Sequence, residues 1–329
     1  MKFIAVKFIV LVSFISVFAQ DQPAQLDALR AEGYDALYNL DYEGARKRFR
    51  SMIELAPDHP AGAQCFASSL WFQQLNEDWQ LKSTLYSTDA DEKPKPQLNR
   101  AQVEEFRKWI RTAKQLSQAR LKKDPRDVEA LYFLGAAEGL EAAYAGGVER
   151  KYRTALRSGS DSVDRHKQVL KISPDFRDAE LTIGLLNYVI GSLPLPVKML
   201  AAAMGVRGSK KRGLEALERV SMEGQWARDA ARVVLIDLYK REKRWTDAFE
   251  MARELSEKYP RNYLFKLQMA DARVLEILAL RKKKASTAAQ EQEVSSIFAS
   301  LLRDKTLDRK TVDLINFRLN ITRQQLAQR

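Results

Sequence analysis

The feature that most constrains the fold of this chain is a set of three residues, small, proline and small, that occurs four times at one spacing. In each copy the proline follows the first small residue by twelve positions and precedes the second by ten. The copies are Ala45, Pro57 and Ala67; Ala113, Pro125 and Gly135; Ser162, Pro174 and Gly184; and Ala248, Pro260 and Ala270. Closely crossing helices need small side chains at the crossing, and a turn between helices needs a residue that ends a helix. The spacing therefore predicts stacked pairs of helices.

The composition favours an all-α fold. The 329 residues contain 14 Gly and 10 Pro and are rich in Ala, Leu, Arg, Lys, Glu and Gln, which have high helix propensity. Hydrophobic residues make up 45% and charged residues 30%, enough for a continuous core beneath a solvated surface. We predict one domain over residues 20–329, an α-α superhelix of about six helical pairs, some of them with insertions.

Residues 1–19 have the pattern of a secretory signal peptide. Lys2 and Lys7 accompany an apolar run from Phe8 to Phe18, and Ala19 offers a cleavage site before Gln20. The alternative is an uncleaved anchor, but the run is shorter than the roughly 20 apolar residues of a spanning helix. We therefore expect an exported protein, either periplasmic or secreted.

Export limits the chemistry expected of the single cysteine and of the basic charge. Cys65 has no second cysteine to pair with, so we predict a buried thiol, with an intermolecular bridge or a reactive nucleophile as alternatives. The formal net charge of +12 favours an anionic envelope component or an acidic protein as partner, and nucleic acid is not expected outside the cytosol. The basic residues are dispersed, which is typical of solvated helix faces.

Two segments resemble tetratricopeptide repeats, whose helix-turn-helix unit has 34 residues. In 26–59, Gly33, Ala45 and Pro57 match the small residues and the closing proline, and in 229–262 Ala248 and Pro260 match them. The resemblance implies a solenoid of repeat-like segments at 26–59, 60–127, 128–176, 177–220, 229–262 and 263–303, with a capping helix at 311–327.

Apolar periodicity and breaks place the other elements. A polar loop is predicted for 76–99, followed by helices at 100–122, 128–145 and 148–172, the last bending near Gly159. Helices at 263–284 and 290–303 are predicted before the cap.

A sharper resemblance covers residues 149–213. The stretch 178–194, together with Gly205, Gly208 and Gly213, is similar to a subgroup of exported bacterial tetratricopeptide-repeat proteins and, more distantly, to the family of the yeast inclusion-body clearance protein. The eukaryotic relatives are associated with mitochondrial or lipid-droplet surfaces and are thought to be adaptors. The resemblance implies an architectural motif and no enzymatic activity.

Residues 181–197 contain no charge, yet Asn187, Pro194 and Pro196 disfavour a membrane span, because proline interrupts the helical hydrogen bonds that lipid cannot replace. We predict a buried helix and a hydrophobic turn. The alternative is that residues 193–200 touch a bilayer interface, with Lys198 reaching the headgroups.

If the pairs stack, their first helices line a concave groove. The predicted groove residues are Tyr34, Leu37, Tyr38, Trp71, Phe72, Tyr132, Tyr188, Lys240 and Arg241. Aromatic side chains there suit an extended peptide or an amphipathic helix. The alternative is that these residues pack in the core.

No catalytic, cofactor or metal-binding pattern stands out. The two histidines, His59 and His166, are far apart in sequence, and His166 occupies a repeat position that is normally buried. We therefore predict a non-enzymatic scaffold of the bacterial envelope that binds a protein segment. The alternative is a protein that binds a membrane or an anionic polymer through its basic surface and residues 193–200.

Overall fold

The structure, a computed structural model, describes residues 22–77, 100–203 and 205–327. Within these ranges the regular elements are helices and no strand occurs, which confirms the all-α class. The predicted signal peptide and nearly all of the predicted 76–99 loop lie outside the described residues. The helices group into two compact units, one of residues 22–77 and 100–173 and the other of residues 174–327. The sequence predicts a single domain.

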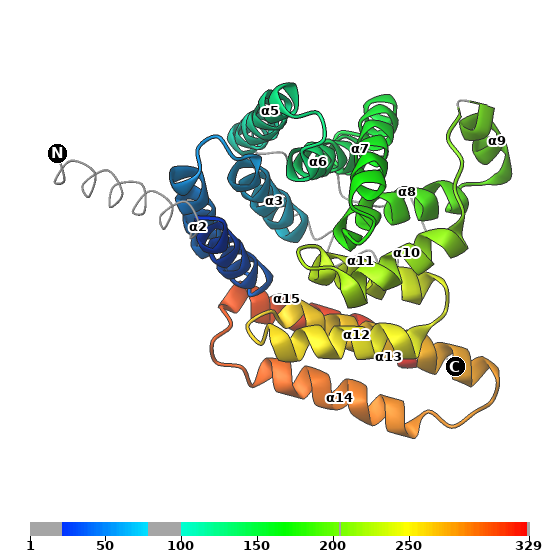
Figure 1. Cartoon of the computed structure of the whole chain (residues 1–329). Helices are drawn as coiled ribbons and strands as arrows, with labels where there is room; N and C mark the ends of the chain where they lie inside the picture. The colour runs from blue at the N-terminus through cyan, green and yellow to red at the C-terminus, as the bar shows by residue number, and fades with distance from the viewer. Residues whose placement is uncertain (1–21, 78–99, 204, 328–329) are drawn as a thin grey trace, which may run out of the picture. The chain divides into compact units, whose positions relative to one another are not determined.

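The N-terminal unit contains three helical pairs (Figure 1). They are the helix at 22–38 with α2 (Tyr42–Leu55), α3 (Pro60–Glu77) with α5 (Arg100–Lys123), and α6 (Val128–Gly147) with α7 (Tyr152–Ile172). In addition, α3 packs on α6, so the first helices of successive pairs touch.

The C-terminal unit continues the pairing. Its elements are η1 (Arg177–Ala179), α8 (Glu180–Ser192), α9 (Leu195–Ala203), α10 (Lys210–Glu223), α11 (Arg228–Arg241), α12 (Trp245–Lys258), α13 (Tyr263–Lys282), α14 (Ala288–Leu302) and α15 (Arg309–Ala327). Helix α8 pairs with α10 and α9 is inserted between them, while α11 pairs with α12 and α13 with α14. Helix α15 packs on α13 and α14. The alternation of paired helices and insertions is the predicted fold class.

The small residues of the fourfold pattern lie at helix crossings. All nine repeat-packing residues are buried: Gly33, Ala45, Ala67, Ala113, Gly135, Ser162, Gly184, Ala248 and Ala270. A Cβ on Gly33 would lie 2.3 Å from Phe49 Cε1, and the Ser162 hydroxyl donates to the Gly135 carbonyl at 2.6 Å. Each of the four prolines lies in the turn that follows a helix. The repeated spacing thus corresponds to two tightly packed helices that are joined by one turn.

The turns inside several pairs have a common geometry. Leu40, Lys243 and Lys284 have φ of 65°, 61° and 57°, and each is followed by an N–H that donates to the carbonyl five residues earlier. This is the Schellman end of a helix, here without its usual glycine.

The start of α7 corrects a predicted boundary. The sequence predicts a helix from Val148, whereas α7 begins at Tyr152. Arg150 has a φ of 56°, which breaks the helical path, and Lys151 is the N-cap residue.

Candidate interaction surfaces

A row of aromatic side chains crosses the first helices of the N-terminal unit. The rings of Tyr34 and Tyr38 stack with centroids 6.1 Å apart, and Phe72 of α3 meets Tyr38 edge-on at 5.8 Å. Further along, Trp71 of α3 meets Tyr144 of α6 edge-on at 5.8 Å. The row is rigid because its inner members, Tyr38 and Tyr144, are buried.

The predicted groove residues are divided between core and surface. Leu37, Tyr38, Tyr132, Tyr188 and Lys240 are buried, so for these five the alternative of core packing holds. Partly exposed are Tyr34, Trp71 and Phe72, and Arg241 is exposed. Six of the nine candidates belong to the N-terminal unit and three to the C-terminal unit.

Hydrogen bonds and an ion pair explain why two of the predicted groove residues, Tyr188 and Lys240, are buried. The Tyr188 hydroxyl donates to Glu242 Oε1 at 2.7 Å, and burial and this hydrogen bond raise the Tyr188 pKa to about 12. Lys240 Nζ lies 2.9 Å from Asp237 Oδ1 and also donates to Gln268.

A glycine seam joins α8 to α10; its members are Gly184, Gly191, Gly208 and Gly213. A Cβ on Gly213 would lie 2.6 Å from the Tyr188 nitrogen, and one on Gly208 would lie 2.6 Å from the Asn187 oxygen. The backbones of α8 and α10 therefore touch at these glycines, where a larger residue would not fit without a shift of one helix.

Helix α9 is a short insertion between α8 and α10, the two helices that meet at the glycine seam. Residues 193–200, predicted as a turn, belong mostly to this helix, which follows the proline break at Pro194. Lys198 does not extend outward: its Nζ donates to the Gly191 carbonyl at 2.8 Å. The outer residues Leu195 and Met199 are 70% and 65% exposed. An apolar surface thus lies where the sequence predicts a hydrophobic turn.

The two histidines and the cysteine, which the sequence offers as candidate reactive groups, take part in packing and helix capping in the structure. His166 is buried, its Nε2 donates to the Tyr132 carbonyl at 3.2 Å, and burial lowers its pKa to about 4. His59 accepts from the Ala61 N–H at 3.2 Å, near the start of α3. Cys65 is buried, as predicted, and desolvation raises its pKa to about 11, which suppresses the reactive thiolate. Across 22–77, 100–203 and 205–327, no group of three or more His, Cys, Asp and Glu side chains is placed to hold a metal ion.

Glu138 in α6 is a buried carboxyl group that sequence analysis missed. It is 6% exposed, its Oε2 has no hydrogen-bond partner, and Arg165 Nε lies 4.0 Å away. Burial raises its pKa to about 7, although Arg165 and Lys114 oppose the shift. An isolated Glu in a helix is an ordinary surface residue, so no sequence signal identifies it.

We expect Glu138→Gln to stabilise the protein at pH 8 by about 3 kcal/mol and to change little at pH 4. The unfolded carboxyl titrates near 4.3, so between that pH and about 7 only the native state keeps the proton and native stability falls as pH rises. Urea unfolding at both pH values measures the difference, with the exposed Glu104→Gln as control. An equal effect of Glu138→Gln at both pH values would contradict this assignment.

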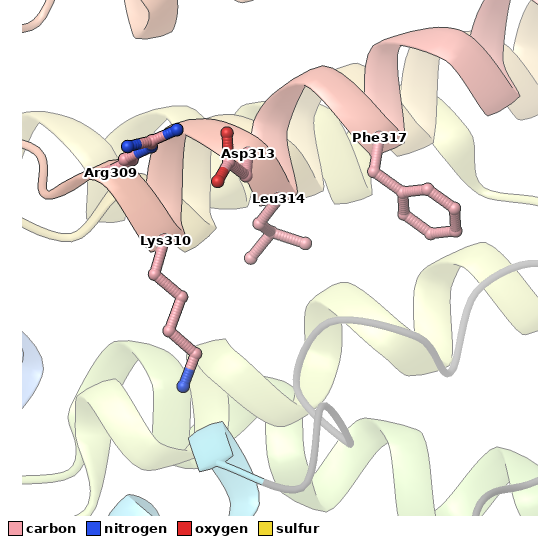
Figure 2. Close-up of a pocket in the computed structure, with 5 residues that line it drawn as sticks. All are labelled: Arg309, Lys310, Asp313, Leu314 and Phe317. Atoms are coloured by element: carbon pink, nitrogen blue, oxygen red, sulfur yellow. The ribbon is translucent and has the colours of Figure 1, made fainter.

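A further exposed aromatic lies on the capping helix. Lys310, Leu314 and Phe317 project from one side of α15 (Figure 2), and Phe317 is 58% exposed. These side chains line a shallow pocket. Its lining residues within the described part of the chain all belong to α15: Arg309, Lys310, Asp313, Leu314 and Phe317. On its inner side Arg318 pairs with Asp271 of α13 at 2.6 Å, both side chains being buried. The helix predicted at 311–327 is therefore fixed to α13, and it exposes the Phe317 ring next to charged side chains.

Among the comparisons with known proteins, the one with solved structures gives matches. No protein-family model matches the sequence. No curated protein matches it. Among solved structures, the chain is similar to the crystal structure of a thermophilic TPR protein from Thermus thermophilus, with 14% identity and a TM-score of 0.41, over 75% of this chain and 98% of that chain. None of the described helices combines the length and the apolar character needed to cross a membrane.

Proposed function

We propose that the protein is a non-enzymatic scaffold that binds a segment of another protein on the aromatic row of the N-terminal unit. The observation that carries the proposal is the partial exposure of Tyr34, Trp71 and Phe72 on adjacent first helices, backed by buried rings. Rigid aromatic side chains offer a large contact area and lose little conformational entropy on binding. An apolar peptide or one face of a helix fits such a surface.

The rest of the N-terminal unit supports a binding role. Stacked helical pairs present continuous surfaces built from successive repeats. His59, Cys65 and His166 are committed to packing and capping, which favours recognition over catalysis.

We assign this activity to the bacterial envelope. The predicted signal peptide at 1–19 supports export, and the net charge of +12 suits a partner of opposite charge. Contact with an anionic membrane is the second candidate function, favoured by the exposed surface of α9.

A capture experiment with matched variants tests the scaffold proposal. The processed protein is used to recover partners from an envelope extract, and a synthetic segment of the recovered partner is then titrated by calorimetry. We expect Trp71→Ala with Phe72→Ala to weaken binding by about thirtyfold, the loss typical of a central aromatic contact. Phe317→Ala, which removes an exposed ring from α15, is the control and should bind like the wild type. Equal affinity of all three proteins would contradict the proposed surface.

A further inference from the structure

Helix α9 and its flanks place an apolar surface next to exposed basic residues. Leu195, Val197 and Met199 are 70%, 46% and 65% exposed, and Val189 at the end of α8 is 53% exposed. Such a group of large apolar side chains on a nine-residue helix is unusual for a surface that contacts only water.

The sequence around α9 has one sign of charge. From Leu181 to Leu214 it contains five basic residues and no Asp or Glu. One of these, Lys198, is the sole charged residue of α9 and is turned inward to the Gly191 carbonyl. Three others, Arg207, Lys211 and Arg212, are exposed on the segment that leads from α9 into α10. The outer side of α9 is therefore apolar, and exposed Arg207 and Arg212 follow it in the chain. Lys210 pairs with Glu242 at 2.8 Å, and Lys211 lies 3.9 Å from Glu215 on the solvent side of α10.

The excursion is held firmly at its base. The backbone contacts of Gly191 with Ser209 and Lys210 close it, and Gly205, with a φ of 82°, ends α9 in a Schellman motif. Within the C-terminal unit α9 extends from the ends of α8 and α10 (Figure 1). Because α9 is held in this way, its apolar side chains can enter an apolar environment while α8 and α10 stay folded.

We propose that α9 docks on an anionic lipid bilayer. Leu195, Val197 and Met199 insert at the boundary between headgroups and acyl chains, and Arg207 and Arg212 contact the lipid phosphates. Charge complementarity selects this occupant: an apolar helix followed by exposed basic residues matches an anionic interface. This proposal rests on the second candidate function, contact with an anionic membrane. Its site lies in the C-terminal unit and is independent of the aromatic row, so its failure would leave the scaffold proposal unaffected.

Vesicle flotation tests the proposal. The processed protein, recovered after export so that residues 8–18 do not themselves bind lipid, is mixed with phosphatidylcholine vesicles with or without phosphatidylglycerol. We expect flotation with the anionic vesicles alone, decreasing as salt is added. Leu195→Asp with Met199→Asp should reduce the partition coefficient at least about tenfold, since charged residues are excluded from the apolar boundary. Arg207→Gln with Arg212→Gln should reduce it roughly fivefold for each charge removed.

Two matched controls separate docking from general effects. Met222→Asp adds a charge at a methionine that is 64% exposed on α10, and Lys282→Gln with Lys283→Gln removes two exposed charges elsewhere in the same unit. Both should float like the wild type, and thermal melting checks that every variant is folded. Equal flotation with neutral vesicles, or undiminished flotation of Leu195→Asp with Met199→Asp, would overturn the proposal. It would also be overturned if the wild type ignored vesicles but formed a dimer that these two substitutions dissociate, which would assign the surface to a second copy of the chain.

Discussion

Replacing Gly213 with alanine is expected to lower the free energy of unfolding by about 3 kcal/mol, the upper end of the usual cost of overpacking. The new methyl group would lie 2.6 Å from the Tyr188 nitrogen and 2.7 Å from the Gly184 oxygen. Both are backbone atoms that cannot rotate away, so α8 and α10 must separate. Separation also disturbs the core cluster around Tyr188, Leu217 and Leu235. Urea unfolding followed by circular dichroism measures the loss.

The control is Gly147→Ala at the end of α6. There the nearest side-chain atom, Trp71 Cη2, would be 3.6 Å from the added carbon, an ordinary contact, so stability should stay the same or rise slightly. If Gly213→Ala were as stable as Gly147→Ala, the backbone contact of the seam would be refuted. Combining Gly184→Ala with Gly213→Ala should cost less than the sum of the two, because both act on one contact.

Removing the Asp178 side chain is expected to destabilise the protein by about 3–4 kcal/mol. This carboxylate is 5% exposed and accepts from the N–H groups of Gln225, Trp226 and Ala227 at 3.2, 2.8 and 2.6 Å. In Asp178→Ala these donors, just before α11, lose their acceptor, and an unsatisfied buried donor costs about 1–3 kcal/mol. Thermal and urea unfolding both report the change.

Two further variants make that result specific. Asp178→Asn keeps one acceptor oxygen and should lose about half as much stability. Asp175→Ala removes a carboxylate that is 98% exposed three residues earlier and should have little effect. A similar small loss for Asp178→Ala and Asp175→Ala would show that the carboxylate does not hold the start of α11.

The helical pairs could be predicted because their signals are local. Each position of the fourfold pattern tolerates few side chains, so the residue types alone indicate the structure. In the first copy they indicate a helix crossing at Ala45, a turn at Pro57 and a second crossing at Ala67. The start of α6 is also fixed by a local contact, since the Asp127 carboxylate accepts from the Ala130 N–H at 2.9 Å. Positive φ at Arg150 leaves no such trace, and the predicted start of α7 was therefore wrong.

The exposed residues were harder to predict because several helices are apolar on more than one side. In α6, five residues in succession, 130–134, are buried, so periodicity does not reveal which face would line a groove. The repeat frame places Tyr132 in the predicted groove, whereas the structure buries it. Only the alternative of bilayer contact has Lys198 reaching outward, and its acceptor in the structure, the Gly191 carbonyl, becomes available only when α9 folds back on α8. Such contacts depend on tertiary structure and have no signature in the residue types.

The glycine seam has a consequence for changes in chain length. Because Gly191 and Gly208 touch through their backbones, residues 192–207 form a closed excursion whose two ends stay together whatever lies between them. The entropy of closing such a loop grows slowly, by about 0.6 kcal/mol for each doubling of length. Residues 192–207 are therefore a natural position for insertion or replacement: a longer segment, an epitope or a fluorescent label can occupy it while α8 and α10 keep their register.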